Sequence, residues 1–277
     1  MAMTHPQLNF ASDKAIVGMI HVRALPGTPY HRLSIDRIIE SAAGEARMLA
    51  EAGCNALIIE NMHDRPYLNR TVGPEIVAGM TAVAVAVRSA ADRPLGVQVL
   101  GGANQEALAI AQAGGAGFVR VEGFIFAHVA DEGLMPDADA GPLLRYRKQI
   151  GAEDIAVLAD VKKKHASHSI TADVDLAETA RAAEFFGADG LVVTGIATGR
   201  PTDRDDVQCV AEAVDVPVAI GSGLTPENLA CCWPVADLFI VGSFVKQGGV
   251  WSNPIDTGRL GAFMDAVSGM REAKRVE

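Results

Sequence analysis

Two glycine–serine turns near the end of the chain form the strongest candidate for a ligand site. Gly221-Ser222-Gly223 follows the apolar run 216–220, and Gly242-Ser243 follows the apolar run 238–241. Thr225-Pro226 then has the residue types of a helix start, with Thr as N-cap and Pro in the first turn. In many parallel barrels the turns after the last two strands hold a phosphate through backbone N–H groups and a helix N-terminus. The residues therefore predict a phosphate site, although tight turns alone would also require glycine.

Ionisable side chains follow most of the predicted strands, and a parallel barrel would gather them at one end. Four of them are candidates for catalysis, namely Glu60, Glu122, Asp160 and Lys162. Carboxyl groups in a cavity can serve as general acid and base. Each residue taken singly is equally well explained by a structural ion pair, whereas together they favour a catalytic or binding cavity. The other polar residues at these strand ends are His21, His63, Asp64, Gln98 and Thr194.

Lys162 is the sharpest single candidate among these residues. It lies two positions after Asp160, so both side chains face the same way if the strand continues. A lysine in a barrel mouth can act as a base, form a Schiff base or neutralise a phosphate. Lys163 and Lys164 follow directly and weaken this interpretation, because a run of lysines is also typical of a solvated loop.

A divalent metal ion is a second use for the acidic and histidine side chains. Oxygen and nitrogen ligands are available from Glu60, His63, Asp64, Asp160, His165 and His168. No fixed ligand signature is present, so the sequence leaves a divalent metal open and indicates no other cofactor. The first strand is not followed by Gly-x-Gly-x-x-Gly, which argues against dinucleotide binding of that kind.

Alternating apolar runs and helical patterns predict eight repeats of strand and helix. The predicted strands are 15–22, 56–59, 95–100, 118–121, 155–161, 191–193, 216–220 and 238–241. The predicted helices begin after Ser34 and Thr225 and otherwise span 74–90, 104–114, 143–150, 173–186, 205–214 and 256–269.

An internal repeat supports this plan, because segments 51–58, 112–119 and 185–192 each join a helix end, a glycine and an apolar strand. We therefore expect an α/β protein with one (β/α)₈ TIM barrel over residues 10–270, with 1–9 and 271–277 as flexible tails. A doubly wound open sheet is the alternative.

Composition limits the class of partner. The chain has 277 residues, 49% of them hydrophobic, and a net charge of −10, which argues against a nucleic-acid or anionic-membrane surface as the main partner. Residues 1–14 lack a signal core, and the apolar stretch 76–87 is too short to span a bilayer. The expected partner is a small phosphorylated ligand, with no integral membrane segment and with a homo-oligomer left open.

The four cysteines, Cys54, Cys209, Cys231 and Cys232, show no C-x-x-C spacing. Reduced thiols in a cytoplasmic protein are the simplest interpretation, with Cys54 and Cys209 mostly buried. The longest connection, 124–139, is either a plain insertion or a mobile lid over the barrel mouth, because long loops in compact domains are often functional.

Five motifs together resemble the BtpA family (the BtpA/SgcQ group) over about residues 13–268. In chain order they are GMIHVRALPGTP, LIIENMHDRPY, LADVKKKHASHS, VTGIATGRPT and AIGSGLTPENL. The resemblance implies a TIM barrel of the phosphate-binding kind. Residues Glu60-Asn61, the run from Asp160 to His165 and Gly221-Ser222-Gly223 fall in the family-like motifs. No catalytic residue is carried over, because no catalytic mechanism defines the family.

Two functions of different classes follow. The first is an enzyme of unknown reaction acting on a small phosphorylated metabolite of the sugar-phosphate or nucleoside type, in line with family members described as enzymes of sugar or nucleoside metabolism. The second, implied only by the family name, is a non-catalytic photosystem I biogenesis or stability factor bound peripherally to photosynthetic membranes. The family also occurs in organisms without photosynthesis, so that role is not general. The acidic chain has no amphipathic anchor, which argues mildly against membrane attachment.

Overall fold

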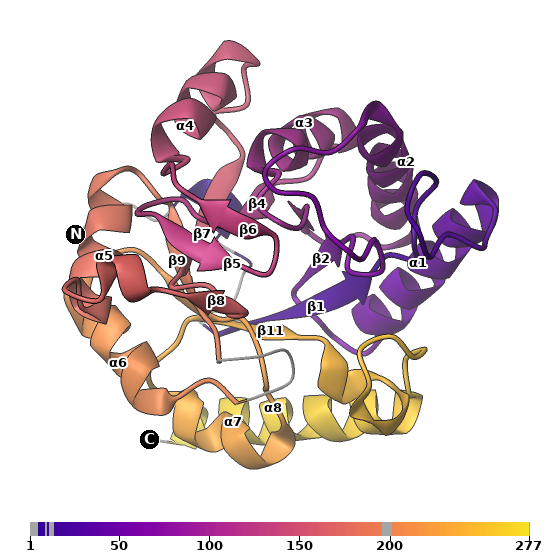
Figure 1. Ribbon diagram of the computed structural model, residues 1–277. Helices are drawn as coiled ribbons and strands as arrows, with labels where there is room; N and C mark the ends of the chain where they lie inside the picture. Colours follow the sequence, from indigo (N-terminus) through magenta and orange to yellow (C-terminus); the bar gives the residue numbers. More distant parts are fainter. Residues whose placement is uncertain (1–4, 9, 11–13, 196–200, 277) are drawn as a thin grey trace.

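Eight parallel strands close into a barrel in the described part of the chain, and helices surround it (Figure 1). The computed structural model describes residues 5–8, 10, 14–195 and 201–276, so part of the motif VTGIATGRPT lies outside the described residues. The strand order around the barrel is β1-β11-β10-β9-β7-β4-β3-β2, and β2 pairs with β1 to complete the circle. The predicted (β/α)₈ barrel is confirmed, and the open sheet is not formed.

The barrel strands and the helices that follow them alternate along the chain. The strands are β1 (Ala15–His21), β2 (Ala56–Glu60), β3 (Leu95–Gln98), β4 (Phe118–Val121), β7 (Ala156–Val161), β9 (Gly190–Val193), β10 (Val218–Ile220) and β11 (Leu238–Val241). The helices are α1 (Ile35–Glu51), α2 (Pro74–Ala90), α3 (Asn104–Gly114), α4 (Ala140–Gln149), α5 (Leu176–Phe185), α6 (Arg204–Ala213), α7 (Pro226–Cys232) and α8 (Thr257–Val276).

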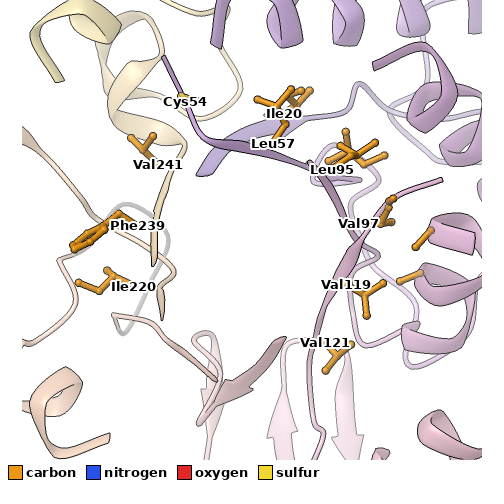
Figure 2. Close-up of a cluster of buried hydrophobic side chains, with 14 of the residues drawn as sticks. Ile20, Cys54, Leu57, Leu95, Val97, Val119, Val121, Ile220, Phe239 and Val241 are labelled. Carbon is orange, nitrogen blue, oxygen red and sulfur yellow. The ribbon is translucent and has the colours of Figure 1, made fainter. Parts of the chain in front are cut away.

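Two apolar layers follow from the alternation of side chains along each strand. Residues on the outer side, such as Leu57, Val97 and Phe239, pack against the helices, and Figure 2 shows this layer. Residues on the inner side, such as Ile58 and Leu158, fill the barrel. Burial on both sides explains why the strands read as continuous apolar runs.

The amino-terminal end of the barrel is closed by residues that the sequence assigns to a tail or its border. Leu8 and Phe10 are buried with the inner layer, and the Phe10 ring lies 5.5 Å from that of Phe118 between centroids. Leu8 therefore belongs to the packed barrel rather than to a flexible tail. At the other end of the chain, α8 continues past the predicted boundary to Val276.

The repeated joints between helix and strand use glycine in the left-handed region, where side chains are disfavoured. Gly53 and Gly187 have φ of 99° and 89°, as the repeat predicts. In the middle copy Gly114 remains helical, and Gly115 takes the left-handed conformation with φ of 71°.

The long connection contains secondary structure of its own. Strands β5 (His128–Ala130) and β6 (Gly133–Met135) form an antiparallel hairpin, and β5 also pairs with β8 (Ala166–Ser167). The small sheet thus links the long connection to the lysine-rich segment after β7.

The four cysteines carry no disulfide, and burial raises the pKa of the Cys54 thiol to about 12. The expectation that Cys209 is buried is wrong, because it lies on the exposed side of α6 while Val207 and Val210 face the core. Within the described residues we find no helix with both the length and the apolar character needed to cross a bilayer.

Gly96 should be required by packing inside the barrel. A Cβ at this position would lie 2.2 Å from the buried ring of Phe118, so Gly96→Ala should lower the free energy of unfolding by about 1–3 kcal/mol. Gly261 in α8 has no atom within 4 Å of such a Cβ, so Gly261→Ala should raise stability by up to about 1 kcal/mol. Urea denaturation of both variants checks the pair, and a Gly96→Ala protein as stable as the parent would contradict the packing described here.

Candidate functional site

The inner side of the barrel changes from apolar to charged toward the carboxyl ends of the strands. Each of the first five barrel strands in the chain ends its inward row with a buried polar residue, while the inward residue two positions earlier is apolar or glycine. These polar residues are His21, Glu60, Gln98, Arg120 and Asp160. The barrel therefore holds a polar layer at the end where such barrels carry their sites.

Arg120 and Asp160 form a buried ion pair between the neighbouring strands β4 and β7 of this layer. The Nε atom of Arg120 donates to Oδ1 of Asp160 at 2.7 Å, and Nη2 donates to Oδ2 at 2.9 Å. Both side chains are at most 2% exposed. Sequence reasoning missed Arg120, although its place two residues after Phe118 on β4 gives the signal. Asp160, a predicted catalytic residue, is thus held against a guanidinium.

Glu60 lies beside His21 on the neighbouring strand, with 3.8 Å between Oε2 and Nε2. The Nδ1 atom of His21 lies 3.0 Å from the carbonyl oxygen of Trp251. Burial lowers the pKa of His21 well below its ordinary value, and burial raises the pKa of Glu60. The imidazole is therefore held neutral, and the carboxyl group is shifted toward its protonated form.

The three consecutive lysines after β7 have three different surroundings. The strand stops at Val161, and Lys162 has a left-handed φ of 49°, so it does not continue the row of Asp160. Its Nζ donates to the carbonyl oxygen of Val174 at 2.7 Å, and Lys162 lines neither of the two cavities described below. The condition for a shared strand face, that the strand continues to Lys162, is therefore not met, although Asp160 and Lys162 both line a small pocket beside the long connection.

Lys163 and Lys164, rather than Lys162, line the barrel mouth. Lys163 Nζ lies 3.2 Å from a carboxylate oxygen of Glu122 and 3.2 Å from one of Glu132, and all three side chains are buried. Lys164 lines the mouth with no hydrogen-bond or ion-pair partner among the described residues. Burial lowers its pKa, and the charge of Arg120 adds to the shift.

A cavity of about 230 Å³ opens at the ends of β10 and β11. All five residues of the two predicted glycine–serine turns line it, namely Gly221, Ser222, Gly223, Gly242 and Ser243. Glu60, Arg120, Lys164 and Arg259 complete its charged wall. The fold thus brings the predicted turns together with Glu60 and with cations that the sequence did not single out.

Two of these glycines also have a packing role. A Cβ on Gly221 would lie 2.6 Å from Val192 and 3.1 Å from Nη2 of Arg120, and one on Gly242 would lie 3.1 Å from the ring of His21. At these two positions packing requires glycine, whereas the tight-turn explanation considered above does not apply, since neither has a left-handed φ. Gly223 differs, because its φ of 70° is left-handed.

Arg259 of α8 contributes a guanidinium to the cavity. Its Nε donates to the carbonyl oxygen of Phe244 at 2.6 Å, and its central carbon lies 4.3 Å from the centroid of the Phe244 ring. Thr225, the N-cap of α7, lines the cavity, and the contribution of this helix start to an anion site stays a prediction. This helix has seven residues, and Thr225 and Asn228 cap each other's backbone N–H groups in a capping box.

A second cavity of about 260 Å³ adjoins the first and shares Glu60, Met62 and Lys164 with it. Its remaining wall includes Arg65, Tyr67, Leu100, Glu122, Asp131, Glu132, Lys163, His165 and Trp251. Asp131 and Glu132 come from the β5–β6 hairpin, so the long connection does lie over the barrel mouth. Gly101 leaves room for Glu132, since a Cβ there would lie 2.6 Å from its carboxyl carbon. The predicted mobility of this lid stays a prediction.

The residues considered as metal ligands lie in separate surroundings. Asp64 accepts from the backbone N–H of Leu25 at 2.8 Å, and His168 Nε2 lies 3.1 Å from the carbonyl oxygen of Lys163. Within the ranges that the structure describes, no group of three or more His, Cys, Asp or Glu side chains is placed to hold a metal ion.

The chain belongs to the BtpA family, whose sequence profile matches residues 12–269. An uncharacterised mitochondrial protein of Caenorhabditis elegans is 43% identical and covers 94% of this chain and 95% of its own. The Photosystem I biogenesis protein BtpA of Synechocystis is 34% identical, covering 94% and 90%. An uncharacterised protein of Archaeoglobus fulgidus is 35% identical, covering 93% and 100%.

Solved structures share the barrel at low sequence identity. Phosphoribosyl anthranilate isomerase of Thermus thermophilus matches with a TM-score of 0.58 and 14% identity, covering 93% of this chain and 100% of its own. Thiamine phosphate pyrophosphorylase of Pyrococcus furiosus matches with a TM-score of 0.57 and 14% identity, covering 95% and 98%. These likenesses show a TIM-barrel fold.

Lys163 should stabilise the barrel mouth in a pH-dependent way. Lys163→Met leaves two buried carboxylates without their cation, so stability at pH 8 should fall by about 3–5 kcal/mol. Burial already raises the pKa of Glu122, and losing the cation raises it further. The folded variant then takes up protons that the unfolded chain does not, so the loss should shrink at pH 5.5.

Urea denaturation at both pH values measures this effect. Lys148→Met, which removes an exposed partner of Glu153, is the matched control and should change stability little. A Lys163→Met protein that is as stable as the parent at pH 8, or equally weakened at both pH values, would contradict the role given to Lys163.

Proposed function

We propose that this chain is an enzyme that acts on a small phosphorylated metabolite of the sugar-phosphate or nucleoside type. The observation that carries the proposal is the cavity in which both glycine–serine turns meet Glu60, Lys164 and Arg259. The turns and Arg259 would hold the phosphate, and the other end of the ligand would extend along the shared wall toward Glu122.

The charges of the first cavity suit an anion despite the net charge of −10. Arg259 is a cation on its wall, and the charge of the nearby Arg120 is balanced by Asp160. A guanidinium matches the geometry of phosphate oxygens and donates several hydrogen bonds to them. The first cavity therefore offers a local positive site in an acidic protein.

The reacting end of the ligand would lie between Glu60 and Lys164. Both groups line both cavities, and both are shifted toward their neutral forms, which suits a general acid and a general base near neutral pH. The proposal moves the catalytic lysine from Lys162 to Lys164 and retains Glu60 and Glu122. Asp160 acts as the residue that orients Arg120.

The alternative is a non-catalytic role in photosystem I biogenesis, as in the printed name of the Synechocystis relative. An assembly factor does not need a cavity that joins glycine turns to titratable groups, so the site favours the enzyme. The cytoplasmic location stays a prediction, and the nematode relative is named mitochondrial.

Arg259 should contribute strongly to phosphate affinity. Isothermal titration calorimetry with inorganic phosphate and glycerol 3-phosphate should show binding that Arg259→Gln weakens about tenfold or more, the range for a hydrogen bond to a charged group. Arg181→Gln, which removes an exposed guanidinium from α5, is the matched control and should bind like the parent. Glycerol should not bind detectably.

Two results of this titration would contradict the proposed site. Equal affinity of the parent and Arg259→Gln for phosphate would place the anion elsewhere. Absence of binding by the parent to either phosphorylated probe would remove the main support for an enzyme of this class.

A further inference from the structure

We infer that Lys164 is a nucleophile that forms an imine with the carbonyl carbon of a phosphorylated aldehyde or ketone. The inference deepens the proposed function by naming the substrate class, and it rests on that function for the place of the phosphate. Three observations carry it: the partners of the lysines, the backbone that presents them and the groups around the amine.

Of the three consecutive lysines 162–164, Lys164 is the one whose amine makes no hydrogen bond or ion pair with the described residues. Lys162 Nζ donates to the carbonyl oxygen of Val174, and Lys163 Nζ lies between Glu122 and Glu132. Lys164 has no such partner in the part of the chain that the structure describes, yet its side chain lines both cavities. An amine that only balanced charge would be expected to contact a carboxylate, as Lys163 does.

The backbone is held in an unfavourable conformation on both sides of this amine. Lys162 and His165 have left-handed φ values of 49° and 55°, which cost energy for residues other than glycine and cluster at functional sites. The departure from strand geometry at Lys162 lets both Lys163 and Lys164 reach the barrel mouth, whereas a regular strand would point one of them outward.

Imine formation needs a neutral amine and a proton donor, and the cavity shifts Lys164 and Glu60 toward these two forms. Burial and Arg120 lower the pKa of Lys164, against the opposing charges of Glu60, Asp160 and Glu122. Burial raises the pKa of Glu60, which lines the same cavities. A buried lysine of lowered pKa and a carboxyl group of raised pKa are a suitable nucleophile and acid.

The step balances with these two groups and the carbonyl compound. The Nζ lone pair forms a C–N bond while the electron pair of the C=O double bond moves to oxygen, and one amine proton transfers to that oxygen. Glu60 then donates a proton to the hydroxyl group, which leaves as water as the nitrogen lone pair forms the C=N bond. The products are a protonated imine, water and the Glu60 carboxylate, whose charge stabilises the iminium.

Reductive trapping tests the inference on the full chain. The protein is incubated with dihydroxyacetone phosphate and sodium cyanoborohydride, and the adduct is located by mass spectrometry after Glu-C digestion. We expect one adduct on Lys164, absent from Lys164→Arg and retained in Lys162→Arg, the matched control. Unphosphorylated dihydroxyacetone should label the same residue at about one tenth of this rate or below, because it lacks the phosphate contacts.

The outcomes separate this inference from the proposed phosphate site. If phosphate binds in calorimetry but no adduct forms, or if surface lysines are labelled equally in Lys164→Arg, the imine inference is wrong and the phosphate site stands. If both carbonyl compounds label Lys164 at the same rate, the nucleophile is supported and the phosphate site is contradicted.

Discussion

The buried pair of Arg120 and Asp160 is the interaction on which the site depends. A guanidinium inside a barrel must have a carboxylate, because a buried charge without a partner is very costly. Asp160 of β7 meets this need with two hydrogen bonds, which fix the guanidinium of Arg120 in the wall of the cavity. Gly221 lies close to this pair, since a Cβ there would be 3.1 Å from Nη2 of Arg120 as well as 2.6 Å from Val192. The pair therefore fixes one part of the cavity wall that Arg120 shares with Glu60 and Lys164.

The barrel could be predicted because its signals are local. Apolar runs, N-caps such as Ser34 and the glycine joints each act within a few residues, and the predicted span 74–90 matches α2 residue for residue. The turns at 221–223 and 242–243 were also placed correctly at one cavity, because consecutive strands of a parallel barrel end side by side.

The choice of lysine could not be predicted, because it depends on one backbone angle. Strand periodicity assigns Lys162 to the row of Asp160, but its left-handed conformation removes it from that row and brings Lys164 to the mouth. The inward position of Arg120 could be predicted from strand alternation once Phe118, two residues earlier on β4, is known to face inward. Arg259 was not, because α8 meets the cavity only through packing of the closed barrel. The arrangement of the candidate site thus depends on tertiary geometry that no short pattern records.

The central claim is that both glycine–serine turns and Arg259 hold a phosphate group beside Lys164. A crystal structure of the protein soaked in phosphate tests it most directly. We expect a tetrahedral anion in the 230 Å³ cavity, within hydrogen-bond distance of Arg259 and of the turns at 221–223 and 242–243. A soaked crystal in which this cavity holds no anion, or in which the anion binds only elsewhere, would contradict it.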